Sequence, residues 1–242
     1  ERFTRARERV LMKNIAYVGV LAALLEIDMA VVRQLLQETF GGKPHLLKTI
    51  VNNLGRETTL TYASSTKYYL ADRAAGTPWA TKLPFPVQVL ESVEALDHVT
   101  GWRFTNTYIY HHGHFDPHER EFRGFGRVDQ WDTESLSDFE GGTNSQLAHH
   151  VPPVCTKTWF HTGVWRDGPT LEAAFAGEYW SGDGAAPPTK ASVLPALRPT
   201  ERKEAARALK GKVLRTEVYG DDGTPQAGIP YVVTTSRYEV RT

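Results

Sequence analysis

Residues 108–134 constrain the fold more than any other stretch, because two runs of alternating apolar and polar residues flank a polar turn. Alternation with a period of two is typical of a half-buried β-strand. The turn contains Asp116 and Pro117, which favour a reversal because proline fixes φ and Asp can bond its own backbone. The return run places Phe125 between two glycines, and glycine inside a strand indicates a bulge or a close backbone approach. The stretch therefore predicts a β-hairpin whose second strand is bent.

The same alternation recurs through the rest of the chain after residue 50. Runs rich in β-branched and aromatic residues, separated by Gly, Pro, Asn and Asp, indicate strands joined as repeated hairpins. We therefore predict a mainly β, mainly antiparallel fold over residues 51–242. The predicted strands are 58–62, 87–94, 103–110, 156–162, 212–219 and 231–240, with a short strand or loop at 67–70 and short helices at 171–179 and 201–209.

Residues 1–49 have a different periodicity. Apolar residues recur at helical spacing over residues 15–25 and again over residues 31–40, where Asp28 can cap the second helix and a Gly-Gly pair can end it. This segment has too few apolar residues to make a large core alone. The sequence thus predicts two parts, a short helical segment followed by the β-rich part.

Charge and cysteine content exclude several classes of function. Lys plus Arg and Asp plus Glu both number 28, so the chain has no basic footprint for nucleic acid or an anionic membrane. The single cysteine, Cys155, excludes a disulfide framework and a cysteine-based zinc site. The sequence contains neither an apolar run of about 18 residues, which a membrane helix needs, nor a visible signal peptide. We expect a chain made in the cytoplasm, with no nucleic-acid or membrane contact.

Histidines and carboxylates gather in the hairpin and admit two interpretations. His112, His114 and Glu119 offer the imidazole and carboxylate ligands that zinc accepts, with both histidines on one side of a regular strand. Such a site would support a metal-dependent hydrolase, which stays an alternative. The simpler interpretation is a set of half-exposed histidines, and on it we expect neither metal nor cofactor. We interpret Cys155 as a small buried residue, because no helix N-terminus activates its thiol.

The hairpin also carries a family resemblance. Residues 110–134, YHHGHFDPHEREFRGFGRVDQWDTE, resemble the middle region of the B component of insecticidal toxin complexes, the Tc toxins. The similarity extends on both sides, for example through NNLGRETTLTY and TKTWFHTG, and covers about residues 51–242. The motif Tyr-x-x-Gly-x-x-Asp-x-x-Glu-Arg-x-Phe-x-Gly-Phe-Gly is carried here by Tyr110, Gly113, Asp116, Glu119, Arg120, Phe122, Gly124, Phe125 and Gly126.

This resemblance implies a structural protein and no enzyme. In the family, the B component and the C component build a hollow β shell of Rhs-related (YD-repeat) hairpins. The shell encloses the toxic C-terminal polypeptide of the C component and passes it to the A-component translocator outside the producing cell. The residues expected to support the hairpins are Trp79, Phe122, Gly124, Phe125, Gly126, Trp131, Trp159 and Phe160, with Arg120 and Arg123 paired to Asp116, Glu119 or Glu121.

Residues 1–49 resemble a different family, the alpha subunit of 2-oxoacid:ferredoxin oxidoreductases. One explanation is a helical cap with a common pattern, and the other is a join of two unrelated sequences near residues 49–51. A non-catalytic fragment of such an oxidoreductase is a further alternative, without activity because the cysteine runs that hold iron–sulfur clusters are absent. The residues that carry this resemblance are Lys13, Asn14, Gly19, Leu24, Asp28, Phe40 and Lys43.

Overall fold

Two units make up the chain, Glu1–Leu47 and Lys48–Thr242. The computed structural model describes residues 46–132, 152–165, 168–182 and 198–240, and all of the elements below belong to the second unit. The helices expected over residues 15–25 and 31–40 lie outside the described residues.

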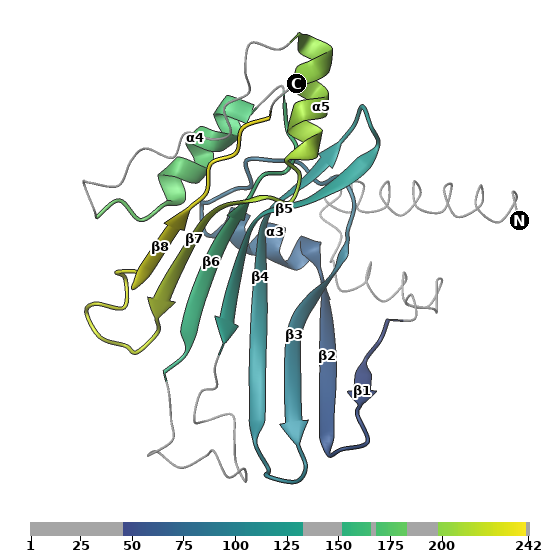
Figure 1. The fold of residues 1–242 in the computed structure, drawn as a ribbon, viewed down its shortest axis with the longest axis vertical. Helices are drawn as coiled ribbons and strands as arrows, with labels where there is room; N and C mark the ends of the chain where they lie inside the picture. Colours follow the sequence, from purple (N-terminus) through teal and green to yellow (C-terminus); the bar gives the residue numbers. More distant parts are fainter. Residues whose placement is uncertain (1–45, 133–151, 166–167, 183–197, 241–242) are drawn as a thin grey trace, which may run out of the picture. The chain divides into compact units, whose positions relative to one another are not determined.

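The strands of the described residues form one antiparallel sheet in which each strand pairs with its neighbours in sequence (Figure 1). Such a meander follows from the alternation, because an antiparallel pair can be joined by a short turn. The prediction of a mainly β, antiparallel architecture is confirmed. The strands are β1 (Thr49–Val51), β2 (Arg56–Ser64), β3 (Gln88–Asp97), β4 (Arg103–Asp116), β5 (Glu121–Asp132), β6 (Val154–Phe160), β7 (Val213–Gly220) and β8 (Val232–Thr235).

Helices interrupt the meander at two places within the described residues. α3 (Ser65–Ala74) connects β2 to β3 and crosses behind the sheet next to β4 (Figure 1). α4 (Gly168–Glu178) and α5 (Pro199–Ala208) both lie between β6 and β7. The two later helices fall where the sequence predicts them, at residues 171–179 and 201–209.

The structure corrects the interpretation of residues 67–70 as a short strand or a loop, because they belong to α3. Ser64 precedes the helix in an extended conformation, and its Oγ accepts a hydrogen bond from the Thr66 N–H at 3.4 Å. A serine in this position satisfies an N–H that the first helical turn leaves free. Tyr68 then anchors the helix in the core, where its side chain is 4% exposed.

The last strand is shorter than the predicted run at 231–240. β8 pairs with β7 from Arg215↔Thr235 to Val218↔Val232. Two backbone bonds extend the contact at its ends, from Tyr231 N–H to the Val218 carbonyl at 2.7 Å and from Ser236 N–H to the Leu214 carbonyl at 2.8 Å. β7 begins at Val213, so the continuous ladder with β8 ends near this point, and Glu239 further on forms a single β-bridge.

The β4–β5 hairpin bends where the sequence predicts it. The register shifts between His114 and Phe115, and one extra residue of β5 is accommodated opposite them. Gly124 lies at this bulge with a φ of 97°, and a Cβ added to it would meet nothing within 4 Å. The glycine is therefore required by its backbone conformation and not by a crowded neighbour.

Two apolar clusters connect the sheet to its helices. The first joins Tyr68 of α3 and Trp79 to Val89 of β3, and partly buried residues that include Tyr110 and Phe125 pack against it. The second lies under α4. It consists of Trp159, Leu171, Phe175 and Leu214, with Val164 and Tyr179 packed against them.

Replacing Gly124 with valine should destabilise the fold by about 1–3 kcal/mol, because a β-branched residue is strained at positive φ. Gly177→Val is the matched control: Gly177 lies in α4, is exposed, and also has nothing within 4 Å of an added Cβ. Chemical denaturation of the two variants and the parent measures the difference. Equal unfolding free energies for the two variants would show that the positive φ carries no cost.

Candidate functional site

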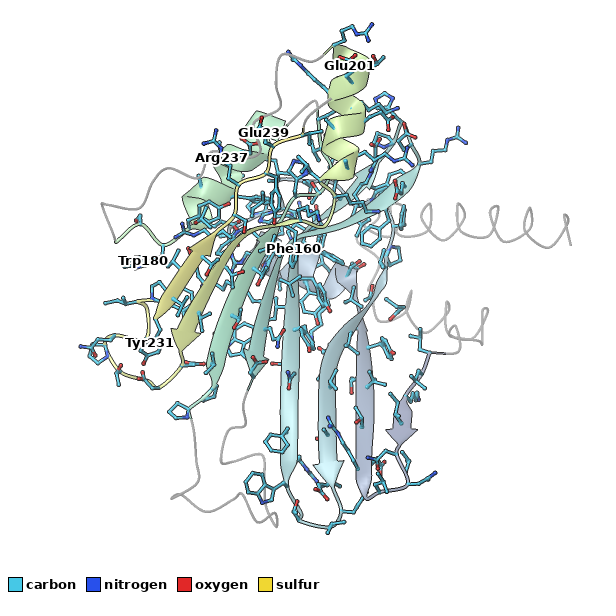
Figure 2. The ribbon with its side chains drawn as sticks, in the orientation of Figure 1. Phe160, Trp180, Glu201, Tyr231, Arg237 and Glu239 are labelled. Atoms are coloured by element: carbon cyan, nitrogen blue, oxygen red, sulfur yellow. The ribbon has the colours of Figure 1, made fainter. Side chains whose placement is uncertain are left out.

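The sequence motif lies on the β4–β5 hairpin and its turn. The Tyr110 ring packs against the Phe125 ring with centroids 4.8 Å apart, and the Phe125 ring packs against the Phe122 ring at 5.5 Å. These three side chains are half-buried. Trp131 at the end of β5 and Phe160 at the end of β6 (Figure 2) are also half-buried and not central to either cluster.

Two motif glycines are crowded by rings from other elements. A Cβ on Gly113 would lie 2.6 Å from the Trp79 ring, and a Cβ on Gly126 would lie 2.6 Å from the Phe175 ring. Real side chains essentially never approach so closely. Trp79 and Phe175 themselves are buried. Both glycines are therefore required by close packing, to which Leu83 and the Phe125 ring also contribute at Gly113, in contrast to the open space at Gly124.

The turn of the hairpin is held by Asp116. Its Oδ1 accepts hydrogen bonds from the backbone N–H groups of His118 at 2.9 Å and Glu119 at 3.2 Å. Its Oδ2 accepts one from Nη2 of the buried Arg123 at 3.2 Å. Burial alone would raise the pKa of Asp116, but these donors together hold the pKa below its usual value. Arg120 is exposed and has a φ of 53°, so of the two arginines the structure places Arg123 in the pair.

Ion pairs connect the same turn to α5. Glu119 pairs with Lys203 of α5, and Lys210, just after this helix, donates from Nζ to Glu121 Oε1 at 2.6 Å. The hydrogen bond from Lys203 lowers the pKa of Glu119, and the one from Lys210 lowers the pKa of Glu121. Residues as far as 89 positions apart thus fix the end of the hairpin against α5.

A further set of polar side chains joins the sheet to α3 and α4, and we call it the polar network. Its members are largely buried and come from three strands and two helices. They are Asp72, His111, His112, Arg127, Asp129, Trp159 and Glu178.

His112 connects the network to the segment after α3 and to the end of α4. Its Nδ1 accepts a hydrogen bond from the Ala80 N–H at 3.0 Å, and therefore the ring proton is on Nε2, which lies 2.6 Å from Glu178 Oε1. The residue is 4% exposed and has a φ of 56°, a backbone angle that is unfavourable for residues other than glycine. Two hydrogen bonds and close packing maintain this conformation, which interrupts the regular alternation of β4.

Glu178 lies at the end of α4, and its carboxylate pairs with the charge of Arg127 on β5. Its Oε2 accepts hydrogen bonds from Trp159 Nε1 at 3.0 Å and from Arg127 Nη1 at 3.3 Å. Burial alone would raise the pKa of Glu178. The hydrogen bonds from His112 and Trp159 and the charge of Arg127 lower the pKa to about 2. The carboxylate is therefore ionised at any ordinary pH.

Arg127 and Asp129 form a two-point ion pair on β5. Nε of Arg127 donates to Oδ1 of Asp129 at 2.7 Å, and Nη2 donates to Oδ2. Paired bonds of this kind are among the stronger ones in proteins. Burial opposes ionisation of Asp129, which is 4% exposed, but His111 and Arg127 hold its pKa below the usual value.

His111 extends the network to α3. Its Nδ1 lies 2.7 Å from Asp72 Oδ2, and its Nε2 lies 3.6 Å from Asp129 Oδ2. Trp79 Nε1 donates to the same Asp72 oxygen at 2.7 Å. Asp72 thus connects a histidine of the sheet with the tryptophan of the first apolar cluster.

A second buried ion pair holds the segment after α4. Arg215 Nε donates to Glu217 Oε1 at 2.5 Å, and the Tyr219 hydroxyl donates to Glu217 Oε2 at 2.5 Å. Glu217 also accepts from the backbone N–H of Trp180 at 3.0 Å, while Arg215 donates to the Trp180 carbonyl at 3.2 Å. Trp180, just beyond α4 (Figure 2), is therefore fixed by charges on β7.

The carboxylates of Glu178 and Glu217 are engaged by donors within the fold. The ligands of the metal-dependent alternative are not gathered: His112 bonds to Ala80 and Glu178, while Glu119 pairs with Lys203. In the part of the chain that the structure describes, no group of three His, Cys, Asp or Glu residues is arranged to hold a metal ion. His112 also has a positive φ of 56°, so β4 departs at this residue from the regular strand on which that alternative rested.

Cys155 is buried, as the sequence predicts, with 6% of its surface exposed. Burial raises the pKa of its thiol to about 11, so the nucleophilic thiolate does not form at neutral pH. Among the described residues, no helix is long and apolar enough to cross a membrane.

Sequence reasoning misses most of the polar network. Asp72 and Glu178 reach the hairpin from 39 and 66 residues away, and no local pattern connects them to it. The one local signal is Arg127 followed by Asp129, because residues two apart in a strand share a face. That spacing indicates an ion pair on one side of β5, but it does not reveal the contributions of Asp72 and Glu178.

Glu178→Gln should destabilise the fold by about 1–3 kcal/mol at neutral pH, because Arg127 and His112 lose a charged acceptor. The depressed pKa of Glu178 stabilises the fold above about pH 4.5, and this contribution is lost as the pH falls towards 2. The parent should therefore lose more stability than the variant over that interval in denaturation experiments. The control is Glu172→Gln on the same helix, where burial raises the carboxyl pKa and neutralisation should cost nothing. Equal losses for both variants would contradict the role given to Glu178.

Comparisons with known proteins give a consistent family. Residues 19–163 match the family model of the insecticide toxin TcdB middle/N-terminal region, and residues 204–242 match that of the TcdB middle/C-terminal region. A comparison with curated protein sequences gives no match.

Solved structures show the same relationship. A crystal structure of TcdB2-TccC3-TEV is 34% identical over 82% of this chain, with a TM-score of 0.70. The Tc holotoxin pore of Photorhabdus luminescens is 34% identical over 81% with a TM-score of 0.70, and a crystal structure of TcdB2-TccC3 is 32% identical over 81% with a TM-score of 0.69. The chain spans 10%, 9% and 10% of the length of these three proteins.

The first family match also corrects one interpretation of the N-terminal residues. It begins at residue 19 and runs through residues 49–51, where a join of two unrelated sequences was one of the two explanations. No comparison supports the oxidoreductase resemblance of residues 1–49. On the strength of the match over residues 19–163, this chain belongs to the family of TcdB-type Tc toxin B components, in their middle region.

Proposed function

We propose that this chain is a structural segment of the β shell that a Tc toxin B component builds with its C component, and that it performs no catalytic step. The observation that carries the proposal is the 34% identity over 82% of the chain to a TcdB2-TccC3 structure at a TM-score of 0.70. The shell would enclose the toxic C-terminal polypeptide of the C component and deliver it to the A-component translocator.

The described sheet suits a segment of a larger wall. β1 and β8 each pair with one neighbour only among the described strands. Both edges expose apolar side chains, with Val51 at 60% on β1 and Val232 at 52% on β8. Tyr231, beside β8 (Figure 2), is 72% exposed, and its ring lies next to Gly220 at the end of β7. Unpaired edges of this kind pair readily with another strand.

The interior chemistry supports the absence of catalysis. The buried acids of the polar network are bonded to arginine, histidine or tryptophan, and the one cysteine has a raised pKa. Among the described residues, groups arranged in this way stabilise a wall, which supports a role without a catalytic step. The relatives' structures contain TccC3 or a holotoxin pore, and the equivalent C component and translocator are the proposed partners here. We propose synthesis in the cytoplasm and release as part of the assembled complex.

Segment exchange tests the proposal. Residues 19–242 would replace the matching stretch of a B component of the TcdB2 type, which is then co-expressed with its C component. The expected result is a B–C complex in which the enclosed polypeptide resists added protease. A matched exchange carrying Gly126→Val should fail, because the valine would meet Phe175, whereas one carrying Gly177→Val should assemble. Assembly without protection of the enclosed polypeptide would contradict a role in the wall.

The isolated chain should associate in solution because its sheet edges are unpaired and its net charge is zero. Light scattering at neutral pH measures the association. Val233→Lys on the edge strand β8 should reduce it, whereas Val99→Lys, at a more exposed apolar residue in a turn, should have less effect although its side chain is more accessible. A monodisperse monomer of the parent at high concentration would show that the sheet is self-contained.

A further inference from the structure

His111 occupies an unusual place in the sheet, between carboxylates from two different elements. Its side chain is 14% exposed, and those of Asp72 and Asp129 are 15% and 6% exposed. Nδ1 faces Asp72 of α3 at 2.7 Å, and Nε2 faces Asp129 of β5 at 3.6 Å. Because the site is largely shielded from water, charges at these distances interact more strongly than they would at the surface.

The two ring nitrogens have different tasks. The Nδ1–H donates to Asp72 Oδ2, which needs a proton on Nδ1 in either charge state of the ring. Nε2 is buried and makes no hydrogen bond among the described residues, and Asp129 is its facing carboxylate. With a proton on Nε2 the contact is attractive. Without it, the nitrogen lone pair faces a carboxylate and the contact is repulsive.

The charges around His111 favour the imidazolium. Asp72 faces it from α3, and Asp129 with its partner Arg127 from β5. Glu178 of α4 acts through Arg127, to which it is bonded. His112, with rings 6.4 Å apart, is the neighbour on the same strand, and its Nδ1 is an acceptor. The cluster therefore contains three carboxylates and one guanidinium, and a second positive charge at His111 brings it closer to neutrality.

We propose that His111 is the titrating centre of a pH-dependent clamp that holds α3 on the sheet when its imidazole carries both protons and loosens α3 when the Nε2 proton is lost. The segment that responds includes Trp79, because its Nε1 donates to the Asp72 oxygen that binds His111. This proposal concerns the isolated fold and does not depend on the shell assembly.

The pKa of His111 supports the clamp. Burial lowers it and the charge of Arg127 lowers it further, but the interactions with Asp129 and the hydrogen bond to Asp72 outweigh both, so the pKa is raised above 6.5. A raised folded-state pKa means that the stabilisation is fully present below the unfolded value of 6.5 and is lost as the pH rises through the folded value. The clamp is therefore closed in mild acid and open in alkali.

Opening should be local and not a global unfolding. The apolar cluster of Tyr68, Trp79 and Val89 also holds α3, and it does not titrate near neutrality. The raised pKa of Tyr68, about 12, lies far above the range in which His111 changes charge. Loss of the clamp should thus increase the opening of α3 while the strands keep their pairing.

Two measurements on the full 242-residue chain test the clamp. Mass-spectrometric exchange of the imidazole C2 hydrogen gives a titration midpoint for His111 that should lie above the midpoint of the denatured chain. Amide exchange, corrected for its intrinsic pH dependence, should show α3 losing protection relative to β6 between about pH 6 and pH 9. The loss should reach about tenfold for each unit by which the pKa is raised.

Variants separate the clamp from general stability. His111→Gln should remove the pH-dependent part of the change in α3 protection. His98→Gln is the matched control, since His98 also pairs with a carboxylate, Glu57, but on an exposed surface, and it should leave the profile unchanged. Asp72→Asn should lower the midpoint of His111. A midpoint of the parent at or below that of the denatured chain would overturn the proposal even if the variants fail to fold, as would an unchanged profile in a folded His111→Gln.

Discussion

The rest of this structure depends on the neutralisation of charges buried against the sheet. Taking Arg127 and Asp129 out of water costs several kcal/mol for each ion unless partners compensate in good geometry. Asp129 meets Arg127 at two points, and the remaining donor of Arg127 is met by Glu178 from α4. The helix must therefore end at one place over β5 for the charge to be satisfied. A slip of the helix or the strand would leave an ion unpaired.

The apolar clusters bury much of the apolar surface, but they do less to determine the position of the helices on the sheet. Trp159, Leu171 and Phe175 would tolerate small shifts of α4, because hydrophobic contact is not directional. The hydrogen bond from Trp159 Nε1 to Glu178 is directional, and it fixes the end of α4 relative to this cluster. The ion pair of Arg215 and Glu217 repeats this arrangement on β7, two strands along the sheet from β5, where it holds the backbone of Trp180. Polar contacts thus select one of several ways in which apolar surfaces could pack.

Local patterns were sufficient for most of the strands, but they missed β1, placed the end of β8 too late and did not reveal the network. Alternation predicted β3, β4 and β7 because successive side chains of a strand point to opposite faces. A strand with one buried face therefore alternates apolar and polar residues. The sequence of α3 was ambiguous, since paired tyrosines suit a strand, and its start depends on the Ser64 side chain together with packing of Tyr68. The partners of His111 and His112 lie 39 and 66 residues away, so only the tertiary fold brings them together.

The glycines of the motif show how a sequence pattern can be specific without marking a reactive site. Gly124 is required by its φ of 97°, a property of the hairpin alone. Gly113 and Gly126 are required by what lies on top of them, since the rings of Trp79 and Phe175 occupy the space of a Cβ. One of these rings belongs to the segment after α3 and the other to α4. The segment after α3 and helix α4 therefore both pack on the hairpin, and this packing accounts for two of the glycines in its motif.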